Sequence, residues 1–521
     1  MRAAVYNVHW STLGGGEQLA GGVAAALARH HDVELLVSHP FDAVVASERL
    51  GFDLTGFPQV PILHGTRAFL ETSAGYDIFA NTSFGSTLPS GSPRSIYYVH
   101  FPKPNGLLSP TEDFRWRMLR PEPLASWIER EHGFWLREFS GMGSWTRGDA
   151  RIDLQIPKGM TLPFRFALSA RAWPEARSPH VTVTMDDRVL YDDVVPHAKR
   201  VKIRTTVTGR GIANPIPVRF ASETFVPRID LGVHDDRELG VVVSHVALGR
   251  RLPSVQPREL ARLSSLPRGG FVNEFTDSYQ AVIANSGYTA RWVETLWGCK
   301  TTVLPPPVRL RLSGAKQPII LAVGRFFPNV SGHSKKQLEL VEAFRLAVQD
   351  GLEDWELHLA GGCSDAERGY VETVRQAAVG LPVQFHVNAR GEDLDELFAA
   401  ASLFWHGAGL GEDLERHPDR FEHFGISVVE AMSAGAVPLV YEHGGPAAIV
   451  GEAGFGVRYS SIEELAAQTV ALTRDPGEIA RQAAAATRRA GDFTFDHFAE
   501  HLDDIVSSID ARGSSRAQEI A

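Results

Sequence analysis

The spacing of apolar residues divides the chain into segments of different kinds. Residues 3–6 and 33–37 are short apolar runs, and residues 19–28 between them are alanine-rich with helical spacing. Similar apolar runs recur at residues 76–80 and 95–99. Strands that alternate with helices in this way predict β-α-β units, in which a parallel sheet carries helices on its faces.

The pattern changes near residue 135 to short runs in which apolar and polar residues alternate. Turns rich in Gly, Pro and Asp separate these runs, which include residues 152–156, 164–168, 181–184, 201–204 and 218–220. A period of two in many short runs predicts an antiparallel β-sandwich. Trp145 and Trp173 lie in this region, and core packing is the favoured role for both over stacking on a sugar.

The α/β pattern returns after Pro267. The runs that predict strands are residues 281–284, 319–323, 356–359, 383–387, 403–405 and 437–440. Helical stretches lie between them, and the prolines that follow Val303 predict a linker. The predicted fold class is therefore α/β, with two doubly wound Rossmann-like domains and an inserted antiparallel β-sandwich.

The predicted domains follow from these changes of pattern. Residues 1–134 and 256–310 form an N-terminal Rossmann-like domain, and residues 135–255 form the inserted sandwich. Residues 311–490 form a C-terminal Rossmann-like domain. Residues 491–512 form a helix that packs back toward the N-terminal domain, and residues 513–521 form a flexible tail.

Composition and charge disfavour several classes of protein. The chain has 521 residues and a net charge of −10, without a basic block that would indicate nucleic-acid binding. Its two cysteines, Cys299 and Cys363, lie far apart and fit reduced thiols better than a disulfide or a metal site. We expect a cytoplasmic protein without a signal peptide or membrane span, and peripheral contact with the inner face of a membrane stays open.

Residues 422–430, Glu-His-Phe-Gly-Ile-Ser-Val-Val-Glu, are the most informative segment. Gly425 precedes a predicted helix and lets a ligand approach the backbone closely. The free N–H groups of the helix's first turn carry the positive end of its dipole, which suits a diphosphate. Glu422 and Glu430 can then contact different parts of one elongated ligand. The alternative is that Glu422 caps the helix and Glu430 is a solvated surface residue.

This segment and the residues that follow it resemble the donor-site signature of family 4 glycosyltransferases, which have the GT-B fold. They are similar in particular to the branch that contains the eukaryotic α-1,2-mannosyltransferase of dolichol-linked oligosaccharide synthesis. The resemblance implies that Glu422 contacts the donor sugar and Glu430 the ribose. It also implies that the amides around Phe424, Gly425 and Ile426 meet the sugar and the diphosphate.

Two cations follow the first strand of the second α/β domain. Gly324 and Arg325 come directly after residues 319–323, and Lys335 opens the next helix. Two cations at a strand end can neutralise a leaving diphosphate in place of a metal, and surface charge is the alternative role. The resemblance implies that they form the family's phosphate-binding pair. The stretch between them is longer than usual, so Lys336 is an alternative to Lys335.

The N-terminal domain, which binds the acceptor in this family, offers fewer motifs. Gly15 and Gly16 lie between the first strand and the first helix, where the resemblance implies contact with the donor diphosphate. The loop is not the G-x-G-x-x-G fingerprint, which disfavours NAD. His100 follows residues 95–99. The resemblance implies that it orients the sugar or the acceptor, and a structural role is the alternative.

Two further elements resemble the family in part. Ser286, in the sequence Asn-Ser-Gly-Tyr-Thr, is expected to cap the helix that follows it. Many relatives carry a Glu shortly after the pair Gly444 and Gly445, where this chain has Ala447 and Ala448. This departure weakens the assignment of the donor.

The predicted function is that of a retaining, metal-independent glycosyltransferase. It moves a hexose, mannose from GDP-mannose being the first choice, to a glycan or lipid-linked acceptor. The expected catalytic residues are His100, Glu422, Arg325 and Lys335, and the GDP- or UDP-linked donor is a substrate, so no cofactor is expected. Two alternatives stay open: a nucleotide-sugar epimerase of GT-B architecture and a non-catalytic glycan-binding protein. The sequence indicates neither the acceptor nor the role of the sandwich.

Overall fold

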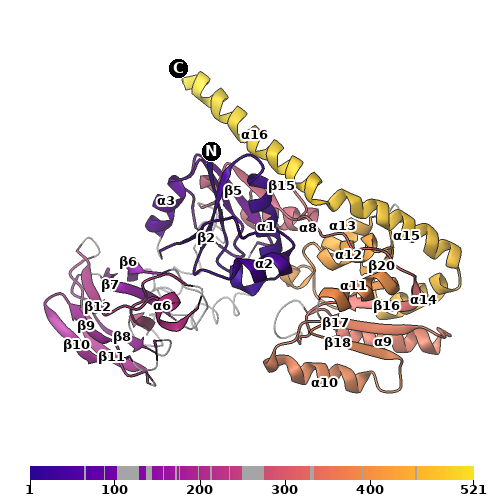
Figure 1. Cartoon of the computed structure of the whole chain (residues 1–521), viewed down its shortest axis with the longest axis horizontal. Helices are drawn as coiled ribbons and strands as arrows, with labels where there is room; N and C mark the ends of the chain where they lie inside the picture. Colours follow the sequence, from indigo (N-terminus) through magenta and orange to yellow (C-terminus); the bar gives the residue numbers. More distant parts are fainter. Residues whose placement is uncertain are drawn as a thin grey trace. The chain divides into compact units, whose positions relative to one another are not determined.

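The chain divides into two compact units in the computed structural model (Figure 1). The first consists of Met1–Tyr97 and Leu108–Gln280, and the second of Tyr98–Leu107 and Ala281–Ala521. The residues that the structure describes are 1–63, 66–86, 88–102, 128–135, 143–156, 158–170, 173–174, 177–197, 199–211, 214–233, 235–248, 275–328, 334–389, 391–451 and 454–520. The predicted domain boundary between residues 255 and 256 lies outside them.

The first unit begins with a parallel sheet. Its strands lie in the order β5-β4-β1-β2-β3 and comprise β1 (Arg2–Tyr6), β2 (Asp32–Val37), β3 (Gln59–Pro61), β4 (Ile78–Asn81) and β5 (Arg94–Val99). The helices that connect them are η1 (Trp10–Thr12), α1 (Gly15–Leu27), α2 (Ala43–Leu50) and α3 (Thr66–Ala74). Ala3, Ala4 and Val5 of β1 are fully buried, because both faces of a parallel sheet are covered. This explains why the strand reads as a continuous apolar run.

Antiparallel strands form the second part of this unit. They are β6 (Ile128–Phe134), β7 (Ser144–Leu154), β8 (Thr161–Ser169), β9 (His180–Met185), β10 (Arg188–Val194), β11 (Val201–Thr208), β12 (Ile216–Ser222) and β13 (Val242–Leu248), with the short helices α6 (Pro227–Leu231) and η2 (Thr276–Ser278) after β12 and β13 respectively. The strand order is β10-β9-β12-β7-β13-β8-β11, and β6 also pairs with β7. The long strand β7 therefore belongs to two layers, since it pairs with β12 along most of its length and with β13 at its first two residues.

Both tryptophans that the sequence singled out contact the core between these strands. Trp173 is buried and donates its Nε1–H to the carbonyl of Gly240 at 2.6 Å. The ring of Trp145 packs edge-on against Phe225. Core packing, the favoured role, is confirmed for Trp173, and Trp145 is partly buried against the same core.

The second unit contains a six-stranded sheet in which all neighbours are parallel. Its order is β18-β17-β16-β19-β20-β21, made of β16 (Gln317–Val323), β17 (Glu356–Gly361), β18 (Val383–Val387), β19 (Ala401–His406), β20 (Val437–Tyr441) and β21 (Val457–Tyr459). The unit also holds the parallel pair β14 (Ala281–Ala284) and β15 (Thr302–Val303), with α8 (Gly287–Trp297) between them. The α/β prediction for this part of the chain is confirmed.

Helices cover both faces of the six-stranded sheet (Figure 1). They are α9 (Gln337–Gln349), α10 (Arg368–Ala377), α11 (Gly391–Ala400), α12 (Ile426–Ser433), α13 (Gly445–Val450), α14 (Ile462–Thr473), α15 (Pro476–Ala490) and α16 (Phe495–Ile520), with the 3-10 turns η4 (Asp365–Glu367), η5 (Pro418–Arg420) and η6 (Gly491–Phe493). Neighbouring residues of β19 enter different cores, since Trp405 packs with Phe344 of α9 and Phe404 with Met432 of α12.

The helix expected at residues 491–512 begins at Phe495. Its helical backbone continues to Ile520, through the segment predicted to be a flexible tail, and that flexibility stays a prediction. Within the described part of the chain, no helix has both the length and the apolar character that crossing a membrane requires.

Candidate functional site

The six-stranded sheet changes its strand order between β16 and β19. From β16 the chain continues to β17 and β18 on one side, and β19 then returns to the other side of β16. Ligands of open α/β sheets bind beyond the carboxyl ends of the strands at such a switch point. Gly324 and Arg325 directly follow β16, and His406 ends β19. The loops that carry the predicted residues therefore lie where this kind of sheet binds its ligands.

The carboxylate of Glu422 lies between a cation and an imidazole at this place. Lys335 Nζ forms an ion pair with Glu422 Oε2, and His406 Nε2 lies 3.1 Å from the same oxygen. The His406 side chain is only 3% exposed, and its carbonyl accepts a 2.9 Å hydrogen bond from the Tyr459 hydroxyl. The structure therefore brings together two of the predicted residues, Glu422 and Lys335. It adds His406, whose position at the end of a buried strand was the available signal.

The structure gives the two adjacent lysines different partners. Lys336 is 3% exposed and pairs at 2.6 Å with Glu412, which also accepts a 3.1 Å bond from Arg420. Burial raises the pKa of Glu412, but the hydrogen bonds from Lys336 and Arg420 outweigh it and hold that pKa below its usual value. Lys336 is thus engaged in a buried ion pair, and Lys335 is the lysine that lies beside Glu422.

A glycine makes room for Lys335 next to β16. A Cβ atom at Gly324 would lie 2.4 Å from Cγ of Lys335, so a larger residue would displace the lysine. Arg325 follows, is exposed, and places its guanidinium 5.3 Å from the ring centre of Phe327. Both predicted cations therefore follow β16 in the same loop region, Arg325 on the surface and Lys335 against Glu422.

The segment that contains Glu422 is held by two glycines after β20. The N–H of Gly445 donates to the carbonyl of Glu422 at 2.8 Å. A Cβ at Gly445 would lie 2.3 Å from the carbonyl oxygen of His423, and one at Gly444 would lie 2.7 Å from that of Glu422. The glycine pair thus permits direct backbone packing against residues 422–424. Sequence analysis found the pair but not this role.

The helix α12 begins at Ile426, and its N-cap Gly425 has φ +106°, a conformation that favours glycine. Phe424 before it is buried against Phe493. The first N–H groups of the helix, at Ile426 and Ser427, precede the first intrahelical bond, which Val428 donates to Gly425. The helix therefore starts where the sequence predicts it, and binding of an anion by these groups stays a prediction.

Glu430 is buried in an ion pair with Arg311. Arg311 Nε and Nη2 donate to Glu430 Oε1 at 2.9 and 2.5 Å, and its Nη1 pairs with Asp395. Glu430 is 9% exposed, so it is not a solvated surface residue. Burial raises the pKa of Glu430, and the Arg311 guanidinium opposes this rise. Arg311 lies 119 positions from Glu430, and no pattern in the sequence predicted this pairing.

The backbone of His100 is fixed by the motif that follows β14. Its carbonyl accepts hydrogen bonds from Asn285 Nδ2 at 3.0 Å and from Thr289 Oγ1 at 3.2 Å. The His100 ring lies 6.2 Å from the ring of Tyr98. These contacts support the structural role, and the orienting role of its side chain stays a prediction.

Ser286 connects this motif to the Glu422 segment. It caps α8 by accepting a bond from the Thr289 N–H at 3.1 Å, as expected. Its hydroxyl also lies 2.5 Å from the carbonyl of His423, to which it donates. The His423 ring stacks on Phe101, with 4.2 Å between ring centres. One serine thus serves both a helix cap and the loop that presents Glu422.

Gly15 and Gly16 lie in the first unit, in the first turn of α1. Gly14 is the N-cap, and its N–H donates to Glu17 Oε2 at 2.8 Å. The same oxygen accepts from the Thr12 hydroxyl at 2.6 Å. Glu17 therefore fixes this glycine loop, and contact of Gly15 and Gly16 with a donor stays a prediction.

Solved structures show a fold similar to that of this chain. The structure of Anabaena HepE in complex with UDP matches 98% of this chain and 100% of its own, at 14% identity and a TM-score of 0.52. Sucrose-phosphate synthase from Thermosynechococcus elongatus matches 98% of this chain and 100% of its own, at 13% identity and a TM-score of 0.50. The predicted GT-B fold is confirmed.

A family model matches part of the second unit. Residues 311–490 match the family described as "Glycosyl transferases group 1".

Curated relatives of the chain share one name, GDP-Man:Man(3)GlcNAc(2)-PP-Dol alpha-1,2-mannosyltransferase. The Xenopus laevis protein is 26% identical over 191 residues, which cover 34% of this chain and 36% of the relative. The Dictyostelium discoideum protein is 27% identical over 224 residues, which cover 38% of this chain and 42% of the relative. The similarity therefore spans well under half the length of either relative.

Substitution of Gly445 tests the packing of the Glu422 segment. We expect Gly445→Ala to lower the free energy of unfolding by about 1–3 kcal/mol, because the new Cβ overlaps the carbonyl of His423. Urea unfolding followed by tryptophan fluorescence measures this. Gly369→Ala is the control, since a Cβ there meets nothing within 4 Å, and it should leave stability unchanged or raise it by up to about 1 kcal/mol. Equal stability of the two variants would contradict the packing argument.

Removal of Arg311 tests the buried ion pair. We expect Arg311→Ala to lower the free energy of unfolding by about 3 kcal/mol near pH 8, because it leaves Glu430 buried without its counter-ion. The folded-state pKa of Glu430 is raised above its unfolded value of 4.5, and removing Arg311 raises it further. The penalty should therefore shrink as the pH falls toward about 5, where the carboxyl group can take up a proton.

Arg309→Ala is the control for Arg311→Ala, and the free energy of unfolding of both variants is measured by urea titration near pH 8 and near pH 5. Arg309→Ala removes an exposed cation that lies 3.6 Å from Asp395, and it should change stability by less than about 0.5 kcal/mol at either pH. A penalty for Arg311→Ala that does not depend on pH would argue against an unpaired Glu430 as its cause.

Proposed function

We propose that the chain is a retaining glycosyltransferase that transfers a hexose from a nucleotide sugar to a glycan or lipid-linked acceptor. The contact of Glu422 with Lys335 and His406, just before α12, carries the proposal. It combines a hydrogen-bond acceptor for sugar hydroxyls with a cation and a helix end for a diphosphate. The group 1 glycosyltransferase match over residues 311–490 supports it.

Each end of the donor has its own partners in this proposal. Glu422 accepts hydrogen bonds from the sugar hydroxyls. Arg325, Lys335 and the first amides of α12 bind the diphosphate. Glu430 binds the ribose. Among the described residues, the hydrogen bonds to the Glu430 carboxylate involve Oε1, which leaves Oε2 for a ribose hydroxyl.

The proposed transfer keeps the configuration of the anomeric carbon. The acceptor oxygen forms a bond to this carbon on the face from which the diphosphate departs. The bond between the anomeric carbon and the diphosphate oxygen breaks, and the acceptor proton passes to the diphosphate. Positive charge at Arg325, Lys335 and the start of α12 stabilises the negative charge that develops on the leaving group. His100 orients the sugar or the acceptor.

The names of the relatives favour GDP-mannose as the first donor to test. A lipid-linked acceptor would bring a cytoplasmic enzyme to the inner face of a membrane, as a peripheral contact.

A donor screen tests the proposed function. The chain is incubated with a panel of GDP- and UDP-linked sugars, and nucleotide diphosphate release is measured with and without acceptor. Proton NMR of the product identifies the anomer. Epimerisation without release would favour the epimerase alternative, and binding without turnover would favour a non-catalytic glycan-binding protein.

Glu422→Gln tests the sugar contact directly. We expect transfer to fall about 100-fold or more, because the amide neither carries the charge of the carboxylate nor accepts at both oxygens. Glu415→Gln changes an exposed glutamate of the same loop and should keep the wild-type rate. The rate of nucleotide diphosphate release in the presence of acceptor measures both variants. A near wild-type rate for Glu422→Gln would contradict the proposed contact between Glu422 and the donor sugar.

Chelation tests the proposed role of the cations in place of a metal. We expect transfer to persist after dialysis against EDTA, because Arg325 and Lys335 supply the positive charge at the diphosphate. The rate is measured before and after dialysis, and again after Mn²⁺ or Mg²⁺ is added. Loss of activity that a divalent cation restores would contradict a metal-independent reaction.

A further inference from the structure

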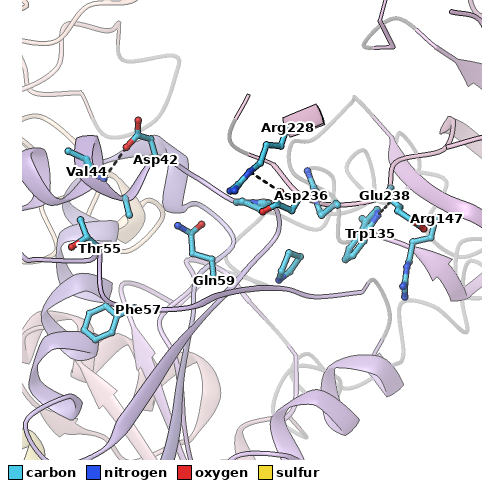
Figure 2. Close-up of a pocket in the computed structure, with 14 residues that line it drawn as sticks. Asp42, Val44, Thr55, Phe57, Gln59, Trp135, Arg147, Arg228, Asp236 and Glu238 are labelled. Atoms are coloured by element: carbon cyan, nitrogen blue, oxygen red, sulfur yellow. Dashed lines mark hydrogen bonds and ion pairs between the residues drawn. The ribbon is translucent and has the colours of Figure 1, made fainter. Parts of the chain in front are cut away.

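The first unit contains a cavity that the donor site does not use (Figure 2). Its volume is about 690 Å³, which is within the usual range of small-molecule sites. One wall comes from residues between Pro40 and Pro61 of the α/β part. The other wall, from the antiparallel part, consists of Trp135, Arg147, Arg228, Asp236, Arg237 and Glu238. The cavity therefore lies where the two parts of this unit meet.

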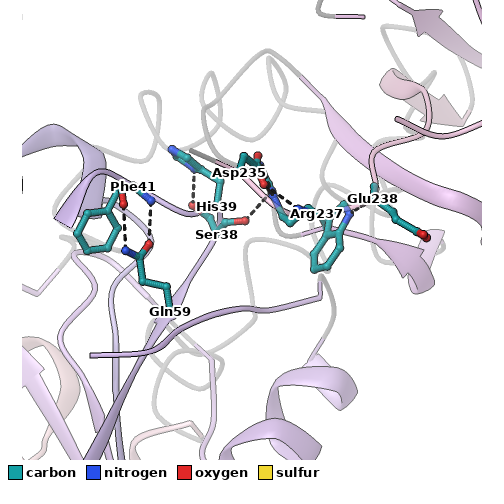
Figure 3. A network of polar contacts seen from close by, with 8 residues as sticks. Ser38, His39, Phe41, Gln59, Asp235, Arg237 and Glu238 are labelled. Atoms are coloured by element: carbon teal, nitrogen blue, oxygen red, sulfur yellow. Dashed lines mark hydrogen bonds and ion pairs between the residues drawn. The ribbon is translucent and has the colours of Figure 1, made fainter. Parts of the chain in front are cut away.

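A buried arginine fixes the two walls against each other (Figure 3). Arg237 is 3% exposed, and its Nε and Nη2 bind Asp235 Oδ1 and Oδ2 at 3.0 and 2.7 Å. Its Nη1 donates to the carbonyl of Ser38, just after β2, at 2.7 Å. Such bidentate pairing has a defined geometry, so the antiparallel part is held against the end of β2.

The opposite wall is fixed as well. The side-chain amide of Gln59 accepts from the N–H of Phe41 at 2.8 Å and donates to its carbonyl at 2.9 Å. Asp42 caps α2 by accepting from the N–H groups of Val44 and Val45. The cavity is thus formed by the protein's own hydrogen bonds before any ligand arrives, which lowers the entropic cost of binding.

The charged side chains of the lining are balanced in number. They are three guanidinium groups, from Arg147, Arg228 and Arg237, and three carboxylates, from Asp42, Asp236 and Glu238. Arg228 already pairs with Asp236 at 2.8 Å. An anion would meet three carboxylates, and a purely apolar ligand would take the charged groups out of water without offering them hydrogen bonds. A neutral ligand with many hydroxyl groups avoids both costs, because each hydroxyl can donate to a carboxylate and accept from a guanidinium.

The apolar part of the lining is compatible with such a ligand. Trp135 is 8% exposed and donates its Nε1–H to the carbonyl of Glu238 at 2.9 Å, so it forms a fixed wall. The Arg147 guanidinium lies over its ring, 5.1 Å from the ring centre, and is exposed to the cavity side. Figure 2 shows Arg147 and Glu238 beside Trp135, with Phe57 on the opposite side. Polar groups and C–H faces of a ligand can both be accommodated.

We propose that this cavity binds a neutral saccharide and is a glycan-recognition site of the first unit. Arg147 and Glu238 contact the sugar hydroxyls, and Phe57 contacts the C–H face of a ring. The choice of a saccharide among polyhydroxylated ligands rests on the proposed function, because a glycan is the acceptor proposed there. The proposal gives a role to the junction between the antiparallel strands and the parallel sheet.

Direct binding in the absence of nucleotide sugar tests this site. An array of neutral and anionic glycans is probed with the whole chain, and the best neutral ligand is then titrated by calorimetry. We expect neutral glycans to be bound, and Arg147→Ala and Glu238→Gln each to weaken the affinity about tenfold or more, the effect of losing one charged hydrogen bond. Both side chains are exposed, so both variants should fold. Arg204→Ala removes an exposed arginine of β11 outside the cavity and should bind as the wild type does.

The outcomes separate this site from the proposed function. Binding that Arg147→Ala and Glu238→Gln both weaken supports the site, even if no nucleotide sugar is turned over. Absence of any bound neutral glycan, a preference for anionic glycans, or unchanged affinity in both variants would overturn it. Arg147→Ala should also leave the hydrolysis of a nucleotide sugar without acceptor unchanged, because the residue belongs to no part of the donor site.

Discussion

The contact between Glu422 and Lys335 is the interaction on which the candidate donor site depends. It joins two loops whose residues lie 87 positions apart, at the carboxyl end of the six-stranded sheet. A carboxylate and an ammonium group that are both partly buried compensate each other's loss of hydration only when they are close together. His406 contributes a third polar group at 3.1 Å. Glu422 is therefore held by both Lys335 and His406.

Small residues around this contact keep Glu422 and Lys335 in position. Gly324 leaves space for the stem of Lys335, and Gly445 lets the loop after β20 pack against the backbone of residues 422–424. Ser286 donates to the carbonyl of His423, so the same segment is held from the side of α8 as well. Small residues are needed at these positions because backbones and side chains approach within distances that a further Cβ would block.

Most of the fold could be predicted from the sequence, because the buried positions of helices and strands are occupied by apolar residues at regular spacing. Strands such as β1 and β19 are covered on both faces and read as continuous apolar runs. The edge strand β10 was not predicted, since most of its residues are exposed and carry no such pattern. Glu422 and Lys335 were predicted from a family motif. Their partners His406 and Arg311 were missed, because pairing between distant positions is set by tertiary packing.

The charges of the candidate donor site have consequences for how a ligand can bind there. Lys335 pairs with Glu422 in the structure, and in the proposed function the same lysine binds the diphosphate while Glu422 binds the sugar. A donor must then supply, at one time, hydroxyl groups for the carboxylate and an anion for the ammonium group. A nucleoside diphosphate alone would offer the anion but leave Glu422 without a replacement partner. The ion pair thus links recognition of the sugar to recognition of the diphosphate, and it favours the intact donor over its parts.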